Sequence, residues 1–389
     1  MLREKIKAMM PQVVHHRRYL HQHPELSKEE VQTSAYVAKV LEQMGLQVRR
    51  QVGGHGLVVD IKGNRPGPWL LIRGDMDALP IQEETDLDYQ SVNPGVMHAC
   101  GHDIHTSNLI GLAQLLLDHQ DQMQGNVRLV FQPAEEGQGG AQAMIDEGIL
   151  EDQPIQAAIA LHVDPQLPIG SAAIEPGPIT SYPSFFSLTI EGQGGHGSLP
   201  FISKDPIRAG VHFYQLISDL HKELNPLHPQ VIQVGAIQAG QAPAVIPNQC
   251  VIKGTVRTHY EADCHLIQNR MQEIANTIAQ LYQVQVSFDF VTMAQPVIND
   301  PDLTESVRQA CLPVFDGGLQ PSLHFKMVGE DFSAFANRLP ACMLLVGCGH
   351  PDQVNYPLHH PRFNPHEDAL YYGIYALACI AFDYLKIPQ

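Results

Sequence analysis

The densest group of side chains able to bind a metal lies between Val96 and His105. This stretch, VMHACGHDIH, contains three histidines, a cysteine and an aspartate. Thiolate, imidazole and carboxylate groups are the usual protein ligands of zinc and of its first-row neighbours. Only Gly101 separates Cys100 from His102, and glycine accepts backbone conformations in which both side chains turn toward one ion. A Cys-x-His pair in a loop is nevertheless more often incidental than part of a metal site.

Three further stretches supply carboxylates and imidazoles. Their side chains are Glu135 and Glu136, then His162 at the end of an apolar run, and the pair His359 and His360 near the C-terminus. Ligand types of this kind, each expected in a loop, suit a metal-dependent hydrolase.

Five motifs make the chain resemble the M20 metallopeptidases. They are IRGDMDALPI, MHACGHDIHT, FQPAEEGQGGA, GGHGS and LHHPRF. Within that family the chain is most similar to the amidohydrolases that cleave N-acyl amino acids, which include aminoacylase-like, hippurate-hydrolase-like and auxin-conjugate-hydrolase-like enzymes. The resemblance covers about residues 17 to 370, and the motifs occur in the family's order. The resemblance therefore identifies the family but says little about which substrate is cleaved.

The resemblance implies a pair of divalent metal ions. Carried over by motif, the ligands are Cys100, His102, Glu136, His162 and His359. Much of the wider family has a bridging aspartate in place of Cys100 and a histidine in place of Asp75, so we expect Cys100 to bridge the ions and His102 to replace the missing histidine. A coordinated thiol is deprotonated, which makes a covalent role for Cys100 the less favoured alternative. Zn²⁺, Mn²⁺, Co²⁺ and Ni²⁺ all stay open, because availability matters as much as affinity.

The neighbouring carboxylates Glu135 and Glu136 need separate roles. In an extended segment their side chains point to opposite sides, and a loop relaxes that rule. We assign Glu135 as the general base, which then acts as the acid toward the leaving amine. Asp77 is expected to orient a ligand histidine without touching metal, and Asp75 could help. His105 is equally consistent with such a supporting role and with a simple helix start.

Three residues from the middle of the chain also match positions of the family. His196, in GGHGS, and Asn248 could donate a hydrogen bond to a developing oxyanion. Arg257 could bind the carboxylate of an N-acyl amino acid through two parallel hydrogen bonds. Without the resemblance, each would be interpreted as a surface residue.

Strands and helices alternate in the part of the sequence that carries the metal-binding residues. Strands are predicted at 57–61, 69–72, 127–131 and 157–161, and helices at 107–117 and 141–149. This alternation predicts an α/β sheet with parallel strands at its centre. Asp75, Glu135 and His162 each come just after a predicted strand, at the sheet edge where open α/β sheets place their sites.

A second pattern occupies the middle of the chain. Strands are predicted at 185–190, 231–237, 251–256 and 284–290, and helices at 205–224, with Ile207, Val211, Tyr214 and Ile217 on one side, and at 262–282. The order β-α-β-β-α-β is that of ferredoxin-like units. We therefore predict an α/β/α catalytic domain formed by residues 1–181 and 294–389, with an inserted ferredoxin-like α+β domain at 182–293. The resemblance implies that this insertion is a lid and dimerisation domain, so a homodimer is expected.

Composition limits the cellular setting and the partners. The 389 residues are 44% hydrophobic and 17% charged, enough for two packed domains, and the net charge of −17 disfavours nucleic acid as a partner. The seven cysteines show no repeated spacing, which indicates free thiols in a reducing compartment. We see no signal peptide and no apolar segment of membrane length. These features predict a cytoplasmic protein that binds neither nucleic acid nor membrane.

The expected reaction is hydrolysis of an N-acyl amino acid to a carboxylic acid and a free amino acid, with a water molecule deprotonated by Glu135. Acetyl, benzoyl and indole-acetyl groups all remain open as the acyl part. A dipeptidase or carboxypeptidase on the same site is the first alternative. A non-catalytic metal or ligand-binding protein is the second, although such a protein needs no base beside its ligands.

Overall fold

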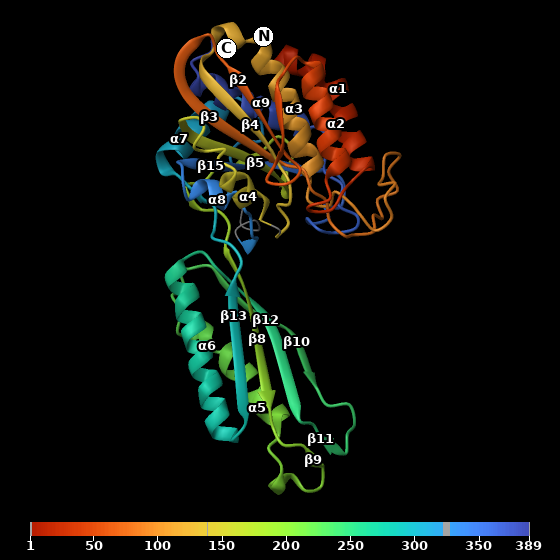
Figure 1. Ribbon diagram of the computed structural model, residues 1–389, viewed down its shortest axis with the longest axis vertical. Coiled ribbons are helices and arrows are strands. Elements are labelled where there is room, and N and C mark those ends of the chain that lie inside the picture. Colours follow the sequence, from red (N-terminus) through yellow and green to blue (C-terminus); the bar gives the residue numbers. More distant parts are fainter. Residues whose placement is uncertain (1, 138, 322–326, 389) are drawn as a thin grey trace. The chain divides into compact units, whose positions relative to one another are not determined.

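A computed structural model describes residues 2–137, 139–321 and 327–388. These residues form two compact units (Figure 1). The first comprises 2–179, 297–321 and 330–388, and the second comprises 180–296 and 327–329. The insertion expected at 182–293 lies inside the second unit, which also includes the short segment 327–329 that the sequence did not indicate. Gln138 of the motif FQPAEEGQGGA lies outside the described residues.

The first unit is built on a seven-stranded sheet with the order β1-β2-β4-β3-β5-β15-β6. The strands are β1 (Val48–Val52), β2 (Gly56–Lys62), β3 (Arg65–Asp75), β4 (Gln124–Gln132), β5 (Ile155–Pro168), β6 (Ala172–Ala173) and β15 (Ala341–Gly349). β4, β3, β5 and β15 run parallel, and the outer strands pair antiparallel. The predicted parallel centre is thus confirmed. A separate pair joins β7 (Gly177–Pro178) to β14 (Ile298–Asn299).

Helices cover both faces of this sheet (Figure 1). One core cluster contains side chains of α1 (Leu2–Gln22), α2 (Val31–Gln43), α3 (His102–Asp118), α7 (Pro301–Cys311) and α9 (Ala369–Tyr384). The short helices α4 (Gly140–Asp146) and α8 (Ser333–Ala336) pack together over β4 and β15. Because both faces are covered, the central strands are apolar runs rather than alternating ones. None of the described helices is long and apolar enough to cross a membrane.

Helix α3 begins at His102, five residues before the predicted start at 107. The first turn is polar, so its hydrophobic periodicity is hidden in the sequence. Gly101 precedes the helix with φ of +87°, and a Cβ atom there would lie 2.4 Å from Cγ2 of Val163. Only glycine fits both constraints, which explains how Cys100 and His102 can face the same region.

The second unit has a four-stranded antiparallel sheet with the order β10-β12-β8-β13. Its elements are β8 (Tyr182–Glu191), α5 (Pro206–Ser218), β10 (Gln230–Ala239), β12 (Gln249–Thr258), α6 (Glu261–Tyr282) and β13 (Gln285–Thr292). This is the predicted β-α-β-β-α-β succession. Two short strands, β9 (Gly195–His196) and β11 (Val245–Ile246), pair in a separate two-stranded sheet.

Of the four residues that the sequence placed on one side of helix α5, only Ile217 is buried. Ala209, Phe213 and Ile217 pack into the core of the second unit. Ile207, Val211 and Tyr214 are 39%, 49% and 42% exposed. The helix carries two apolar stripes, and periodicity alone does not reveal which of them meets the sheet. We call Ile207, Val211 and Tyr214 the outer stripe of α5.

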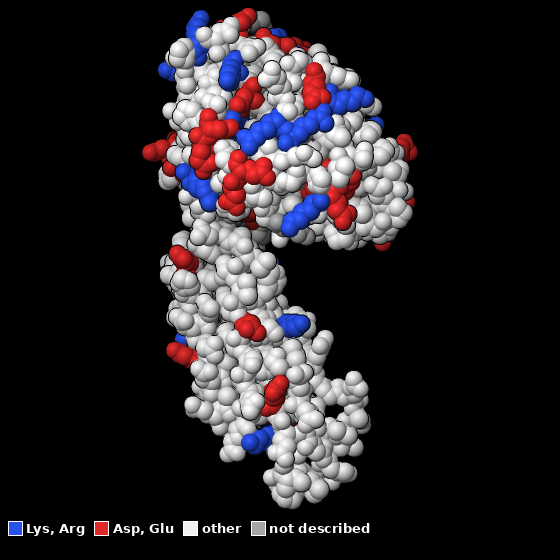
Figure 2. Space-filling view, viewed as in Figure 1, with Lys and Arg blue, Asp and Glu red and all other residues white. Residues whose placement is uncertain are grey.

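The acidic surplus of the chain is not gathered into one patch on the face seen in Figure 2. On this face of the first unit, acidic and basic side chains are interspersed. On the second unit, charged side chains are sparse in the same view. The negative charge therefore offers no broad surface of a single sign there.

Candidate metal centre

The carboxyl ends of the central strands position the candidate site. Asp75 is the last residue of β3, Asp77 follows two residues later, and Glu135 lies three residues beyond the end of β4. His162 differs from the prediction, because it lies within β5 rather than after it. The pairing of β5 with β3 ends before His162, but β5 continues because it still pairs with β15. In that pairing Leu345 lies opposite His162.

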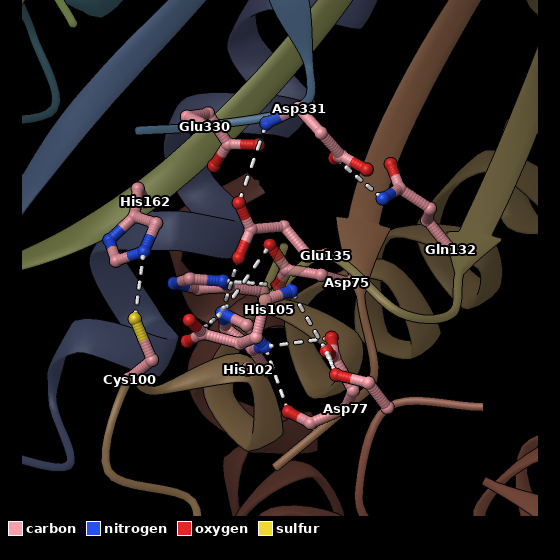
Figure 3. A network of polar contacts seen from close by, with 12 residues as sticks. Asp75, Asp77, Cys100, His102, His105, Gln132, Glu135, His162, Glu330 and Asp331 are labelled. Carbon is pink, nitrogen blue, oxygen red and sulfur yellow. Dashed lines mark hydrogen bonds and ion pairs between the residues drawn. The ribbon is translucent and has the colours of Figure 1, made fainter. Parts of the chain in front are cut away.

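Two triads of potential metal ligands share Cys100. Cys100, His102 and His162 form one triad, and Cys100, Glu136 and His359 form the other, with the ligand atoms of each triad within 4.8 Å of one another. Figure 3 shows Cys100 Sγ directed at the ring of His162, whose Nε2 is 3.5 Å away. His359 Nε2 lies 3.2 Å from Glu136 Oε1. The structure thus brings together all five ligands predicted from the motifs.

His359 and its neighbour His360 differ in their surroundings. His359 has a left-handed backbone with φ of +64°, and its amide donates to the carbonyl of Ala99 at 2.8 Å. His360 instead accepts the amide of Arg362 on Nδ1 and stacks on Tyr356. Among the described residues, only His359 of this pair belongs to a potential ligand group.

The ring of His102 is oriented by Asp77. Its Nδ1 donates to the Asp77 carbonyl at 2.8 Å, so in a neutral ring the lone pair lies on Nε2. Burial lowers the pKa of His102, but the charge of Asp75 and the bond to Asp77 outweigh it and raise the pKa to about 10. The same carboxylates that favour a proton on this ring would favour a divalent cation beside it.

His162 and His105 differ in what their rings can still bind. His162 Nδ1 donates to the Val163 carbonyl at 2.8 Å, which directs Nε2 toward Cys100. His105 bonds Asp75 through Nδ1 at 2.6 Å, and its Nε2 accepts the amide of Val163 at 3.0 Å. Both nitrogens of His105 are therefore occupied, and His105 supports the site from the first turn of α3.

The two neighbouring carboxylates face different surroundings in a turn. The amide of Glu136 donates to Asp77 Oδ2 at 3.0 Å, and the carboxylate of Glu136 faces His359. Glu135 is 8% exposed and lies near Glu330 and Asp331 (Figure 3). Burial, together with the charges of Glu330 and Glu136, raises the pKa of Glu135 well above its ordinary value. A carboxylate with a raised pKa is better matched to accepting and returning a proton near neutral pH.

A buried arginine that was not among the residues predicted for the site balances these acids. Arg73 is fully buried and donates to Asp75 at 2.6 Å, to Glu330 at 2.9 Å and to Asp331 at 3.1 Å. Gln132, at the end of β4, accepts from the same guanidinium and donates to Asp331 (Figure 3). Arg73 therefore ties the segment at 330–331 to the strand ends beside Glu135.

The donor set fits divalent metal ions. Among the described residues, His102 Nε2 is a buried atom with no hydrogen-bond partner. Glu136 Oε1 is buried with only the close contact to His359, and buried polar atoms of this kind are usually satisfied by a ligand. Burial and the charges of Glu136 and Glu135 raise the pKa of the Cys100 thiol well above its ordinary value. The thiolate needs a nearby cation to form, and thiolate, imidazole and carboxylate are the ligands of zinc and its neighbours.

The remaining site candidates lie in the second unit. His196 is exposed, and the amide of Ser198 donates to its Nδ1 at 3.2 Å, which leaves Nε2–H as the donor of a neutral ring. Asn248 Oδ1 accepts the amide of Gly194 at 2.8 Å. Arg257, on β12, lies over the ring of Phe185. His196 belongs to no potential ligand group in the described residues.

Comparison with known proteins identifies the family. Residues 71–383 match the sequence profile of peptidase family M20/M25/M40. The chain belongs to this family. It is therefore a metal-dependent hydrolase of amide bonds, the class predicted from the motifs.

Individual M20 relatives resemble the chain over nearly its whole length. It is 36% identical to the N-acetyl-L-cysteine deacetylase of Bacillus subtilis, over 96% of this chain and 88% of the relative. It is 33% identical to thermostable carboxypeptidase 2 of Saccharolobus solfataricus, over 98% of each. The crystal structure of the Bacillus subtilis YXEP protein, described as a dinuclear metal-binding peptidase of the M20 family, superposes with a TM-score of 0.84 at 31% identity, over 98% of this chain and 100% of that one.

In this M20 chain a buried ionic network holds the first turn of α3. Asp103, next to His102, accepts from Arg17 at 2.8 Å and bonds His21 at 2.8 Å. His21 in turn lies 3.0 Å from Glu83. Burial raises the pKa of Asp103, but Arg17 and His21 outweigh it and hold the pKa well below its ordinary value. The N-terminal helix thus fixes a neighbour of the candidate ligands.

Proposed function

We propose that the chain hydrolyses the amide bond of N-acyl amino acids, releasing a carboxylic acid and a free amino acid. The observation that carries this proposal is the sharing of Cys100 by two ligand triads beside the buried carboxylate of Glu135. Similarity to an N-acetyl-L-cysteine deacetylase supports an acylated amino acid as the substrate class.

Cys100, His102, Glu136, His162 and His359 would hold two divalent ions, with Cys100 as the ligand common to both. When bound, such a pair polarises a substrate carbonyl and lowers the pKa of a water molecule. Zn²⁺, Mn²⁺, Co²⁺ and Ni²⁺ are all compatible with this donor set. Asp77 would keep His102 in the tautomer that a ligand needs.

Glu135 carries the proton in the proposed reaction. It takes a proton from the attacking water molecule as the water oxygen bonds to the amide carbon. The C–N bond then breaks, and Glu135 returns the proton to the leaving amine nitrogen. General acid–base catalysis of this kind contributes typically ~10²–10⁴-fold to the rate.

Three further residues would bind the rest of the substrate. Arg257 would pair with the carboxylate of the amino acid part. Asn248 Oδ1 already accepts a hydrogen bond from the amide of Gly194. The Nδ2 group of Asn248 would therefore be the donor to an oxyanion. Nε2–H of His196 would donate to the developing oxyanion in the site of the partner subunit.

We also propose that the second unit forms a homodimer and that His196 completes the site of the partner subunit. Among the described strands, β10 pairs only with β12, so its other edge can accept a strand from a second copy. The outer stripe of α5 adds exposed apolar surface, and α5 contacts β10. Free edges and apolar patches of this kind are common features of self-association surfaces.

The cytoplasm is the proposed location. All seven cysteines are free and buried. A chain with this many free thiols suits a reducing compartment.

A carboxypeptidase or dipeptidase is the second candidate, and similarity to a carboxypeptidase favours it. A dipeptide also presents an amide next to a carboxylate, so the same groups could bind it. Membership of a hydrolase family argues against the non-catalytic alternative.

A substrate panel tests the proposal. Metal-free protein is reconstituted with each of the four ions and offered N-acetyl, N-benzoyl and indole-acetyl amino acids alongside unblocked dipeptides. We expect kcat/KM for at least one N-acyl amino acid to exceed that for the matched dipeptide by about tenfold or more, because the free amine of the dipeptide must be desolvated. Faster release from the dipeptides would favour the peptidase, and no release from either would contradict both.

Cys100 is expected to act through metal bonds rather than as a nucleophile. A thiol reagent should leave Cys100 unmodified in the metal-loaded protein and modify it after chelation. Cys100→Asp should keep more metal than Cys100→Ser, because a carboxylate can bridge two ions. Mass spectrometry and metal analysis measure both effects, with buried Cys342 as the internal control. An acyl adduct on Cys100, trapped with substrate, would instead establish covalent catalysis.

A further inference from the structure

The backbone immediately before Glu135 is held in an unfavourable conformation. Ala134 has φ of +53°, in the left-handed region, and is 2% exposed. For an L-residue the left-handed conformation is higher in free energy than the right-handed one, so contacts with the surroundings must hold Ala134 there. The chain turns here from the end of β4 toward α4, which begins at Gly140.

Glu30 supplies the contact that can hold this turn. Its Oε1 accepts the amide of Ala134 at 2.7 Å, and its side chain is fully buried. Glu30 also stands at the N-cap of α2, yet its side chain makes no capping bond there. Glu25 accepts the amides of Gln32 and Thr33 instead. The Glu30 carboxylate is therefore directed away from its own helix and at the segment that carries Glu135.

A second carboxylate holds the other side of Glu135. Asp77 Oδ2 accepts the amide of Glu136 at 3.0 Å and the hydroxyl of Ser27 at 2.6 Å. The segment containing Ser27 is itself fixed against the loop after β3, since the amide of Ala78 donates to the Glu25 carbonyl at 2.8 Å. The peptide groups on both sides of Glu135 are thus bonded to carboxylates, one of them from the N-terminal segment.

We propose that Glu30 is a positioning residue for Glu135: it holds Ala134 in the left-handed conformation and so aims the Glu135 carboxylate. This inference rests on the proposed function, in which Glu135 is the base. Glu30 touches neither substrate nor metal. Its loss acts through the placement of Glu135, and misplacing a catalytic group by about 1 Å can cost on the order of 10²-fold in rate.

The experiment compares three variants. Glu30→Ala removes the acceptor, Glu30→Gln keeps an oxygen that can accept the Ala134 amide, and Glu29→Ala changes the exposed neighbour as a control. We expect Glu30→Ala to lower kcat by about 10²-fold with KM changed by less than about threefold and metal content unchanged. Glu30→Gln should stay within about threefold of wild type, and Glu29→Ala should match wild type.

A second readout requires no hydrolysis. In metal-free protein, hydrogen exchange of the peptide containing Ala134 should be about tenfold faster in Glu30→Ala than in Glu30→Gln, because the charged hydrogen bond is lost. Adding Ala134→Gly to Glu30→Ala should recover kcat by at least about threefold, since glycine adopts the left-handed conformation without penalty. If Glu30→Ala does not fold, Glu30→Asp, whose carboxylate is one methylene too short, takes its place.

The outcomes separate the two ideas. If wild type hydrolyses no N-acyl amino acid, the proposed function fails, while the exchange measurement still decides whether Glu30 holds Ala134. If wild type is active and Glu30→Ala keeps its kcat, or if exchange at Ala134 is unchanged, the positioning role is wrong. Equal losses in Glu30→Ala and Glu30→Gln would also overturn it.

Discussion

Replacing Glu135 by glutamine is expected to lower kcat by about 10²–10⁴-fold while the metal content stays at the wild-type level. Glutamine keeps the shape of the side chain and removes its ability to take a proton. Burial and nearby carboxylates raise the pKa of Glu135. The surroundings of Glu135 therefore favour its role in proton transfer. Steady-state kinetics and metal analysis on the same samples measure the two effects.

Glu136→Gln is the matched control, because it makes the same change one residue away. Glu136 Oε1 is a buried atom that faces the ring nitrogens of His359 and His102. We expect this variant to lose metal, and to regain part of its activity when excess metal is supplied. Normal turnover by metal-loaded Glu135→Gln would show that the base has been assigned to the wrong residue.

The sequence placed the candidate ligands in recognisable stretches, and the structure brings their side chains close together. Cys100 and His102 flank a glycine that the structure requires, and Glu136 follows a strand end. The regular elements were predictable for a similar reason, since apolar strands and amphipathic helices leave periodic patterns. His162 was misplaced relative to its strand, because the length of β5 depends on β15, a partner far away in the sequence.

The residues that hold the ligands in place were not predictable in the same way. Glu30 is one of two adjacent glutamates before a helix, and nothing in the sequence indicates that it is fully buried while Glu29 is exposed. Arg73 lies inside a strand, where its bonds to Glu330 and Asp331 depend on a segment more than two hundred residues away. Such contacts are set by tertiary structure, which local patterns do not encode.

The two apolar stripes of α5 show the same limit in the second unit. Ile207, Val211 and Tyr214 were predicted on the same side as Ile217. Only Ile217 of these four reaches the core, where it packs with Phe213. The outer stripe is instead left available on the surface of the described chain. This exposure is one of the observations that support a dimer, and dimer formation leads to a second strong prediction.

Mixing two inactive variants is expected to restore activity. In the proposed dimer, Glu135 comes from one subunit and His196 from its partner, so Glu135→Ala and His196→Ala homodimers should each lose about 10²-fold or more in turnover. In a mixed dimer, one site carries both changes and the other carries neither. Random exchange of subunits makes half of the dimers mixed, each with one intact site. Activity should therefore recover to about a quarter of the wild-type value by symmetry.

The deciding measurement is turnover after the two variants are unfolded together and refolded at equal concentration. Differently tagged subunits confirm that mixed dimers have formed, and each variant refolded alone is the control. His196 has an exposed Nε2–H whose tautomer is fixed by the amide of Ser198, so His196→Ala removes a donor without disturbing a packed core. If His196 acts within its own subunit, both sites of a mixed dimer are damaged and nothing recovers. Confirmed mixed dimers without recovered turnover would refute the shared site, whereas recovery to a quarter requires that one subunit supply His196 to the other.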